Sequence, residues 1–176
     1  MKSQHELSYP IGTFAAIPSP SANIIADWQQ IIADFPNQLR TATSGLSSQE
    51  LAYHYRPGGW TIRQVVHHCA DSHMNAFIRF KLALTEDKPS IKPYNEAAWA
   101  EMADYHLPIE ISLAILEGIH TRWVALLNGM KEDQYQCSFF HPEHGAPFSL
   151  LLGLDNYQWH CRHHLAHVKQ AKALKF

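Results

Sequence analysis

The sequence predicts an all-α protein built as a four-helix bundle with a long crossover between the second and third helices. Four long stretches place apolar residues at helical spacing, and no stretch of convincing length alternates between apolar and polar residues as a strand does. Amphipathic helices bury their apolar faces against one another in a bundle. With 176 residues and 46% hydrophobic content, the chain can form one domain, residues 1–176, around a sizeable core.

Residues 1–20 contain three of the ten prolines, and this composition predicts an extended N-terminal arm. The first bundle helix is expected to begin near Ser21 or Ala22. Its apolar pattern continues to Leu39 but contains Pro36. Because proline lacks a backbone N–H and crowds the preceding turn, we expect the helix to kink or break there.

Residues 47–50 resemble the start of a short helical turn, and the Pro-Gly-Gly sequence at 57–59 is a strong helix breaker. From Trp60 to about Thr85 apolar residues recur at helical spacing, which predicts the second long helix. Residues 86–108 hold three prolines and are therefore expected to be a crossover with at most a short helix near 95–103.

The third long helix is predicted over Ile109 to Met130. Residues 139–147 contain two prolines and a glycine and are expected to form a loop. A fourth helix is expected from Phe148 or Ser149 to about Leu174.

Composition excludes several classes of function. The formal net charge is −2 and there is no run of Lys and Arg, which argues against nucleic-acid binding. No apolar stretch approaches ~20 residues, and the first residues lack the apolar core of a signal peptide, so we expect neither a membrane span nor export. The three cysteines form no CxxC pair. This cysteine usage predicts a cytoplasmic protein. With nucleic acid and membranes excluded as partners, we expect the substrate to be a small molecule.

Histidine is the anomaly, with 13 residues against 14 Lys plus Arg. Four of them fall within residues 160–167, inside a helix-forming stretch. Histidine is the commonest protein ligand of transition metals, and residues four apart lie one turn from each other on a helix. His160 and His164 could therefore bind the same ion, and a metal site is the leading hypothesis.

Helical geometry ranks the histidines of the fourth helix. His160 and His164 lean towards the apolar face, where a bundle builds its metal sites. His163 and His167 form a second pair with the same spacing but point towards water or a partner. These two residues, the outer face of the fourth helix and the N-terminal arm therefore suggest a surface for a homodimer.

The second helix contributes His67, His68 and His73. His73 falls close to the centre of the apolar face, whereas His68 and His67 lie well away from it. By periodicity alone His73 is the most inward-facing of the three, and periodicity gives no ground for choosing His68 over it. His68 does share a stripe with polar residues that suit the wall of a pocket: Ser72, Asn75 and Arg79.

Other candidate residues have structural interpretations. Cys69 and Cys161 adjoin histidines but fall on apolar faces, so we expect them to pack in the core. A single histidine on such a face is usually a hydrogen-bonded structural residue. His141 and His144 belong to the expected loop, where they could form a lid, a pocket wall or a solvated turn.

Several segments together resemble the YfiT branch of the DinB superfamily. The match spans nearly the whole chain, and its two histidine motifs are specific in their spacing; the segments are residues 9–12, 56–68, 70–75, 77–81, 140–143 and 157–167. The resemblance implies a four-helix bundle that binds one divalent metal through His68, His160 and His164. In that branch the ligand on the second helix lies eight residues after the tryptophan, so His67, at seven, does not match it. His73 matches a position of the branch that is not a ligand, and Cys69 replaces a common aliphatic residue.

Members of this branch resemble metal-dependent hydrolases that use zinc or nickel and are often dimeric. Other superfamily members are transferases or isomerases that use a low-molecular-weight thiol. The metal chemistry does not separate the two, because an ion held by three imidazoles lowers the pKa of bound water from about 15.7 to about 7 and acidifies a thiol as well. A glutathione-S-transferase-like role is therefore the alternative to a hydrolase.

A second polar group is needed to move protons or orient the substrate, and Asn75, Arg79 and His141 are the candidates. No water-activating carboxylate is evident, because Asp71 falls off the polar stripe and Glu143 lies in the expected loop. A non-enzymatic metal-binding module would need a closed coordination sphere, and three ligand candidates argue against closure. We expect a hydrolase with one divalent metal per chain, zinc before nickel.

Overall fold

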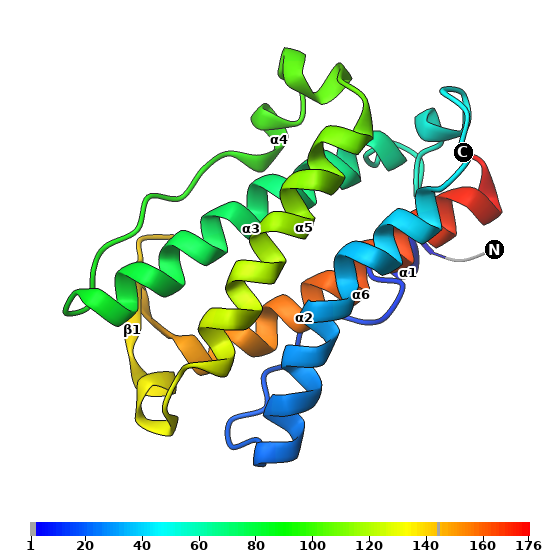
Figure 1. Ribbon diagram of the computed structural model, residues 1–176. Helices are drawn as coiled ribbons and strands as arrows, with labels where there is room; N and C mark the ends of the chain where they lie inside the picture. The colour runs from blue at the N-terminus through cyan, green and yellow to red at the C-terminus, as the bar shows by residue number, and fades with distance from the viewer. Residues whose placement is uncertain (1–2, 144) are drawn as a thin grey trace.

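The computed structural model describes residues 3–143 and 145–176, and it confirms the four-helix bundle. Figure 1 shows its long helices, which are α2 (Ala22–Thr43), α3 (Ile62–Thr85), α5 (Ile109–Asn128) and α6 (Leu150–Leu174). Helices α2 and α3 do not face each other directly: each packs against both α5 and α6. The apolar face of every long helix therefore has two neighbours, and the four faces enclose one core.

The crossover between α3 and α5 is confirmed. It carries the short helix α4 (Glu96–Trp99) and a 3₁₀ turn at Ala103–His106, as expected near 95–103. Near its end the Leu107 carbonyl accepts a hydrogen bond from Arg63 at the start of α3 (3.0 Å). The crossover therefore returns the chain along the bundle, and α3 and α5 run parallel (Figure 1).

Of the kink or break expected at Pro36, the break does not occur, because α2 continues through it. Proline removes one helical hydrogen bond by leaving the carbonyl four residues earlier without its N–H donor. That carbonyl belongs to Ile32, and it instead accepts a 2.6 Å hydrogen bond from Nδ1 of His120 on α5. A partner from a neighbouring helix thus satisfies the group that proline leaves open.

The N-terminal arm is not wholly extended, as was expected for residues 1–20. Ser3 and Glu6 form a capping box that begins the short helix α1 (Gln4–Ser8). The segment is tied to α6 by four long-range hydrogen bonds: His167 to the Ser8 carbonyl, Gln170 to the Leu7 carbonyl, Trp159 to the Gly12 carbonyl, and the Ile17 amide to Asp155. It covers one face of the last helix.

A small antiparallel hairpin, β1 (Ser138–His141) with β2 (Ala146–Ser149), occupies the expected loop, so the expectation of no strands is wrong there. Each strand has four residues, too short to give a sequence signal. Cross-strand packing of Phe139 on Phe148 supports it, with ring centroids 5.4 Å apart. The amide of Phe140 also donates to the Pro89 carbonyl of the crossover. His144 lies outside the described residues, as do residues 1 and 2.

Cys69 and Cys161 lie in the core, 0% and 1% exposed, as expected for packing residues. Both are free, and burial raises the pKa of each thiol. Within the described ranges, no helix has the length and apolar character that a membrane span requires.

Candidate metal centre

Helices α3 and α6 bring three histidines together near the middle of the bundle. One ring nitrogen from each of His68, His160 and His164 lies within 4.8 Å of the other two. His160 and His164 are one turn apart on α6, with ring centroids separated by 4.4 Å. His68 approaches from α3, whose start is fixed by a capping box between Thr61 and Gln64.

The spacing of these nitrogens fits a transition-metal ion. The Nε2 atoms of His68 and His160 are 3.3 Å apart. Two nitrogens bound tetrahedrally at about 2.0–2.1 Å from zinc are separated by about 3.3–3.4 Å. Nδ1 of His68 has no hydrogen-bond partner among the described residues, so no such hydrogen bond restricts the orientation of the His68 ring. The three residues therefore fit a divalent ion that accepts neutral nitrogen donors.

Burial keeps the three imidazoles neutral. Burial, with a smaller contribution from the neighbouring His167, lowers the pKa of His68 to about 4. It holds the pKa of His160 and of His164 well below the ordinary value, and the surrounding imidazoles add to the effect. A neutral imidazole offers one lone pair, so each residue can act as a ligand at neutral pH.

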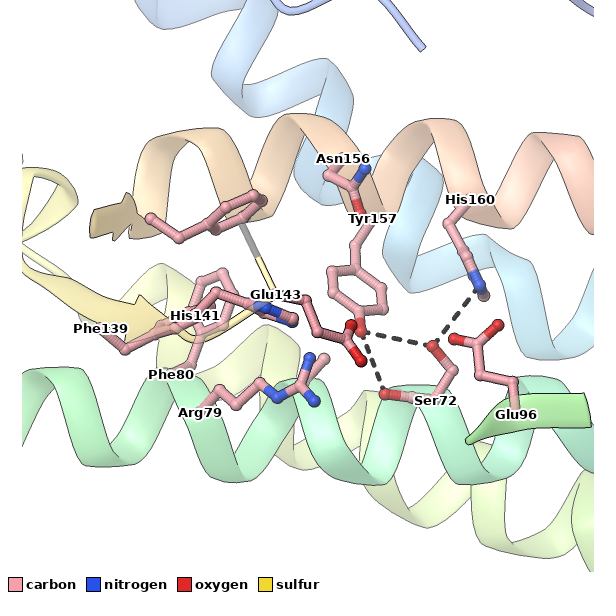
Figure 2. A pocket seen from close by; sticks show the side chains of 13 residues that line it. Ser72, Arg79, Phe80, Glu96, Phe139, His141, Glu143, Asn156, Tyr157 and His160 are labelled. Carbon is pink, nitrogen blue, oxygen red and sulfur yellow. Dashed lines mark hydrogen bonds between the residues drawn. The ribbon is translucent and has the colours of Figure 1, made fainter. Parts of the chain in front are cut away.

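Aromatic and hydroxyl groups surround the cluster. The Trp60 ring packs on His68 at 4.6 Å between centroids. Figure 2 shows that the Ser72 hydroxyl reaches both Nε2 of His160 (3.5 Å) and the Tyr157 hydroxyl (3.3 Å). Because the Tyr157 hydroxyl also donates to the Ser72 carbonyl, the polar wall beside His160 is held in place.

Two cavities adjoin the cluster. The first, about 210 Å³, extends from His160 towards the hairpin (Figure 2). The second, about 370 Å³, lies on the side of the N-terminal segment and is lined by Tyr9, Trp60 and the histidines of α6. Glu96 and His160 line both cavities. The cluster is therefore reached by two spaces that a small molecule could enter.

Of the other predicted site residues, some line the cavities and one does not. Arg79 and His141 line the first cavity, as does Glu143. Asn75 lines neither cavity, and its amide donates to the Asp71 carbonyl on its own helix (2.9 Å).

Glu96 is the functional candidate that the sequence did not reveal. It begins the short helix α4 in the crossover, where the Asn95 side chain caps the helix. Although the residue is exposed, partial desolvation raises the pKa of its carboxyl, whereas the positive charge of Arg79 lowers it. The capping signal was visible in the sequence, but nothing there placed the crossover over the cluster.

The two remaining histidines of α3 have hydrogen-bonded structural positions. His67 donates from Nε2 to the Leu107 carbonyl (3.1 Å) and bonds the Ser112 hydroxyl through Nδ1 (2.7 Å). His73 is fully buried and bonds Nδ1 of His160 (3.0 Å), on the side away from His68. His68 therefore joins the pair on α6, and His73, which periodicity placed further inward, lies behind it.

His163 and His167 do not face water, contrary to expectation. They are 7% and 2% exposed because the N-terminal segment covers them. His167 bonds the Ser8 carbonyl (3.0 Å) and stacks on Tyr55 at 3.8 Å between ring centroids. Together with His164 these residues form a second group of nearby nitrogens. The positive charge of Arg56 acts on His167 and opposes a further cation there.

Comparisons with known proteins identify the family of this chain. A family model described as the DinB superfamily matches residues 32–168. A Bacillus mycoides protein named "Putative metal-dependent hydrolase" is 48% identical over 163 residues, which cover 93% of this chain and 94% of the relative. An Oceanobacillus iheyensis protein with the same description is 48% identical over 160 residues, 91% of this chain and 92% of the relative.

A solved structure is also similar. It is YfiT from Bacillus subtilis, described as "a probable metal-dependent hydrolase with an unusual four-helix bundle topology". The two structures superpose with a TM-score of 0.92 at 43% sequence identity, covering 96% of this chain and 97% of the other.

Proposed function

This chain belongs to the DinB superfamily, and we propose that it is a metal-dependent hydrolase in which His68, His160 and His164 hold one divalent ion. The observation that carries the proposal is the convergence of three neutral imidazoles beside two cavities. The descriptions of the similar proteins support the same class of reaction. Three protein ligands suit a catalytic rather than a structural site, because structural zinc sites use four.

Zinc is the ion we propose first and nickel second, since imidazole nitrogen suits both. When bound by three neutral imidazoles, such an ion retains its positive charge, acidifies water and polarises an acyl oxygen.

The chain's own residues provide the proton transfer. Glu96 lines both cavities together with His160, so its carboxylate can accept a proton from a water molecule beside the centre. Glu96 is exposed, but partial desolvation raises the pKa of its carboxyl, which makes it a stronger base than a fully solvated glutamate. We propose Glu96 as the general base.

The remaining walls bind and orient the substrate. Arg79 presents a positive charge to the first cavity, where it can hold a carboxylate or an acyl oxygen. Phe139 and Phe148 form an apolar wall of the same cavity. The cavity therefore suits a small molecule with an apolar part, a polar or anionic group and a hydrolysable acyl bond.

We also propose that residues 1–176 form one DinB-like domain and that the protein is a homodimer. The dimer surface cannot include His163 and His167, because the N-terminal segment buries them. A molar mass from light scattering that equals one chain at micromolar concentration would exclude the dimer.

Metal analysis combined with activity assays tests the proposed function. The native protein should purify with about one zinc or nickel ion per chain and should hydrolyse members of a panel of esters and amides. His164→Ala should lose both properties, whereas His106→Ala, which changes an exposed histidine, should keep both. Full metal occupancy in the His164→Ala protein would refute the centre.

A further inference from the structure

Behind the proposed centre, the buried His73 and His120 and the half-buried His160 form a continuous line of hydrogen bonds that ends on the backbone of α2. Nδ1 of His120 bonds the Ile32 carbonyl oxygen at 2.6 Å. Nε2 of His120 bonds Nδ1 of His73 at 2.7 Å. Nε2 of His73 bonds Nδ1 of His160 at 3.0 Å. The line crosses from α2 through α5 and α3 to α6.

The Ile32 carbonyl at the end of this line determines which ring nitrogen of each of the three histidines carries the proton. A carbonyl oxygen only accepts, so Nδ1 of His120 must carry a proton. A neutral imidazole has one donor and one acceptor, so Nε2 of His120 accepts and Nδ1 of His73 donates. By the same step Nε2 of His73 accepts and Nδ1 of His160 donates. His160 is thereby left with a lone pair on Nε2, the atom that faces His68.

This direction requires neutral rings, and their surroundings favour that state. His73 is 0% and His120 is 2% exposed. No carboxylate is hydrogen-bonded to His73, His120 or His160 in the part of the chain that the structure describes. A buried cation without a carboxylate partner is costly.

Pro36 makes the terminal carbonyl available. In an uninterrupted helix the N–H of residue 36 would bond the Ile32 carbonyl, and proline has none. The residue that was expected to kink or break α2 therefore provides the acceptor on which the proton order depends.

A second, shorter line orders His164 in the same way. Nε2 of His167 donates to the Ser8 carbonyl at 3.0 Å, which leaves a lone pair on Nδ1 of His167. That atom lies 3.4 Å from Nδ1 of His164 and can accept a hydrogen bond from the proton on it. Nε2 of His164 is then free for a metal ion. His68, by contrast, has no such partner on Nδ1 among the described residues.

We propose that His73, His120 and His167 are positioning residues, which hold the protons of His160 and His164 on Nδ1 and so direct both Nε2 lone pairs to one point. The orienting role of these residues rests on the proposed metal centre. The order of the ring protons does not, because it follows from the hydrogen bonds of the metal-free protein. Groups that orient a metal-bound histidine typically contribute about 10- to 100-fold to metal affinity.

The proton order can be measured directly in the metal-free protein. Long-range ¹H–¹⁵N NMR spectra distinguish a protonated from an unprotonated ring nitrogen, and single His→Gln variants assign the signals. His73, His120 and His160 should all carry their proton on Nδ1, and His167 on Nε2. A proton on Nε2 of His73 or His160 would overturn the proposal, even if the metal centre were correct.

Metal affinity provides the second readout, with zinc as the probe. His73→Gln keeps an oxygen acceptor near the position of Nε2, whereas His73→Leu removes it. We expect His73→Leu to bind zinc about 10- to 100-fold more weakly than the native protein, and His73→Gln to recover most of that loss. Equal losses in both variants would refute an orienting role. If His73→Leu does not fold, the same comparison with Gln and Leu at position 167 replaces it. If native protein does not bind zinc, the metal centre fails, and the NMR result alone decides the proton order.

Discussion

His120 occupies the hydrogen-bonding place that Pro36 leaves open in α2, through a 2.6 Å contact with the Ile32 carbonyl. This contact joins α5 to α2 and fixes the orientation of a buried imidazole. Burial lowers the pKa of His120 to about 4, although the backbone hydrogen bond partly raises it. The ring therefore makes the stability of the fold depend on pH.

Unfolding measurements in the metal-free protein test this dependence. Between pH 6.5 and about 4 only the unfolded chain protonates His120, so stability should fall as the pH falls. The loss is about 1.4 kcal/mol per pH unit, or about 3 kcal/mol in all. The titratable groups around the ring are His73 on α3 and Glu117 on α5. Glu117 and His120 line a further cavity together, between α2 and α5.

The matched variants isolate the contribution of His120 from that of the other buried histidines. His120→Asn, whose amide can still donate to Ile32, should lose stability less steeply from pH 6.5 to 4 than the native protein. His106→Ala, at an exposed position, should keep the native slope. Identical slopes of unfolding free energy against pH in all three proteins would contradict the prediction.

Added zinc should stabilise the native fold through His68, His160 and His164. At a concentration 100 times the Kd, a ligand that binds only the folded state contributes about 2.7 kcal/mol. For a domain of this size that raises the Tm by roughly 5–10 °C. Thermal scans with zinc and with a chelator should show this shift in the native protein and not in His68→Ala. An undiminished shift in His68→Ala would place zinc elsewhere.

Local patterns account for most of what the sequence predicted correctly. Each long helix repeats its apolar spacing over about 20 residues, and His160 with His164 is a spacing within one helix. Periodicity placed His73 further inward than His68, although both are buried on α3, so it gave no ground for choosing His68. The resemblance to a known family was needed to prefer His68, which is the residue that lies beside the pair on α6.

Long-range packing accounts for the errors and omissions. The helical wheel turned His163 and His167 outwards because it does not include the segment around Ser8, which covers them from more than 150 residues away. Glu96 lines both cavities with His160 only because the crossover folds over that part of the bundle. Pro36 was expected to kink or break α2, and the contact from His120 that satisfies the freed carbonyl is likewise tertiary.

Glu96→Gln should slow hydrolysis without removing the metal. Loss of a general base typically lowers kcat by about 10²- to 10⁴-fold. Glu101→Gln, a change at an exposed position of the same crossover outside both cavities, is the matched control and should have native activity. Steady-state kinetics with metal analysis on each protein provide the measurement. Native turnover by Glu96→Gln would exclude this residue as the base.

Arg79→Met should weaken substrate binding and shift the pH profile. A hydrogen bond to a charged group contributes about 1.5–3 kcal/mol, which corresponds to roughly a 10- to 100-fold rise in KM for an anionic substrate. Because Arg79 lowers the pKa of Glu96, its removal should also move the acidic limb of the kcat/KM profile to higher pH. Lys81→Met, at an exposed position on the same helix, should do neither. A lower or unchanged pH for that limb would contradict the coupling.

Thiol dependence separates the hydrolase from the transferase. If the centre activates water, turnover of an ester or amide should need no added thiol. It should also rise with pH through an apparent pKa of about 7. If it activates a thiol, turnover of an electrophile should saturate with thiol concentration and stop without it. His164→Ala should abolish either activity and so serves as the control for the centre rather than for the reaction. Assays with and without a low-molecular-weight thiol, on metal-loaded native protein, therefore decide between them. An absolute thiol requirement would replace the proposed hydrolase with a metal-dependent thiol transferase that uses the same three histidines.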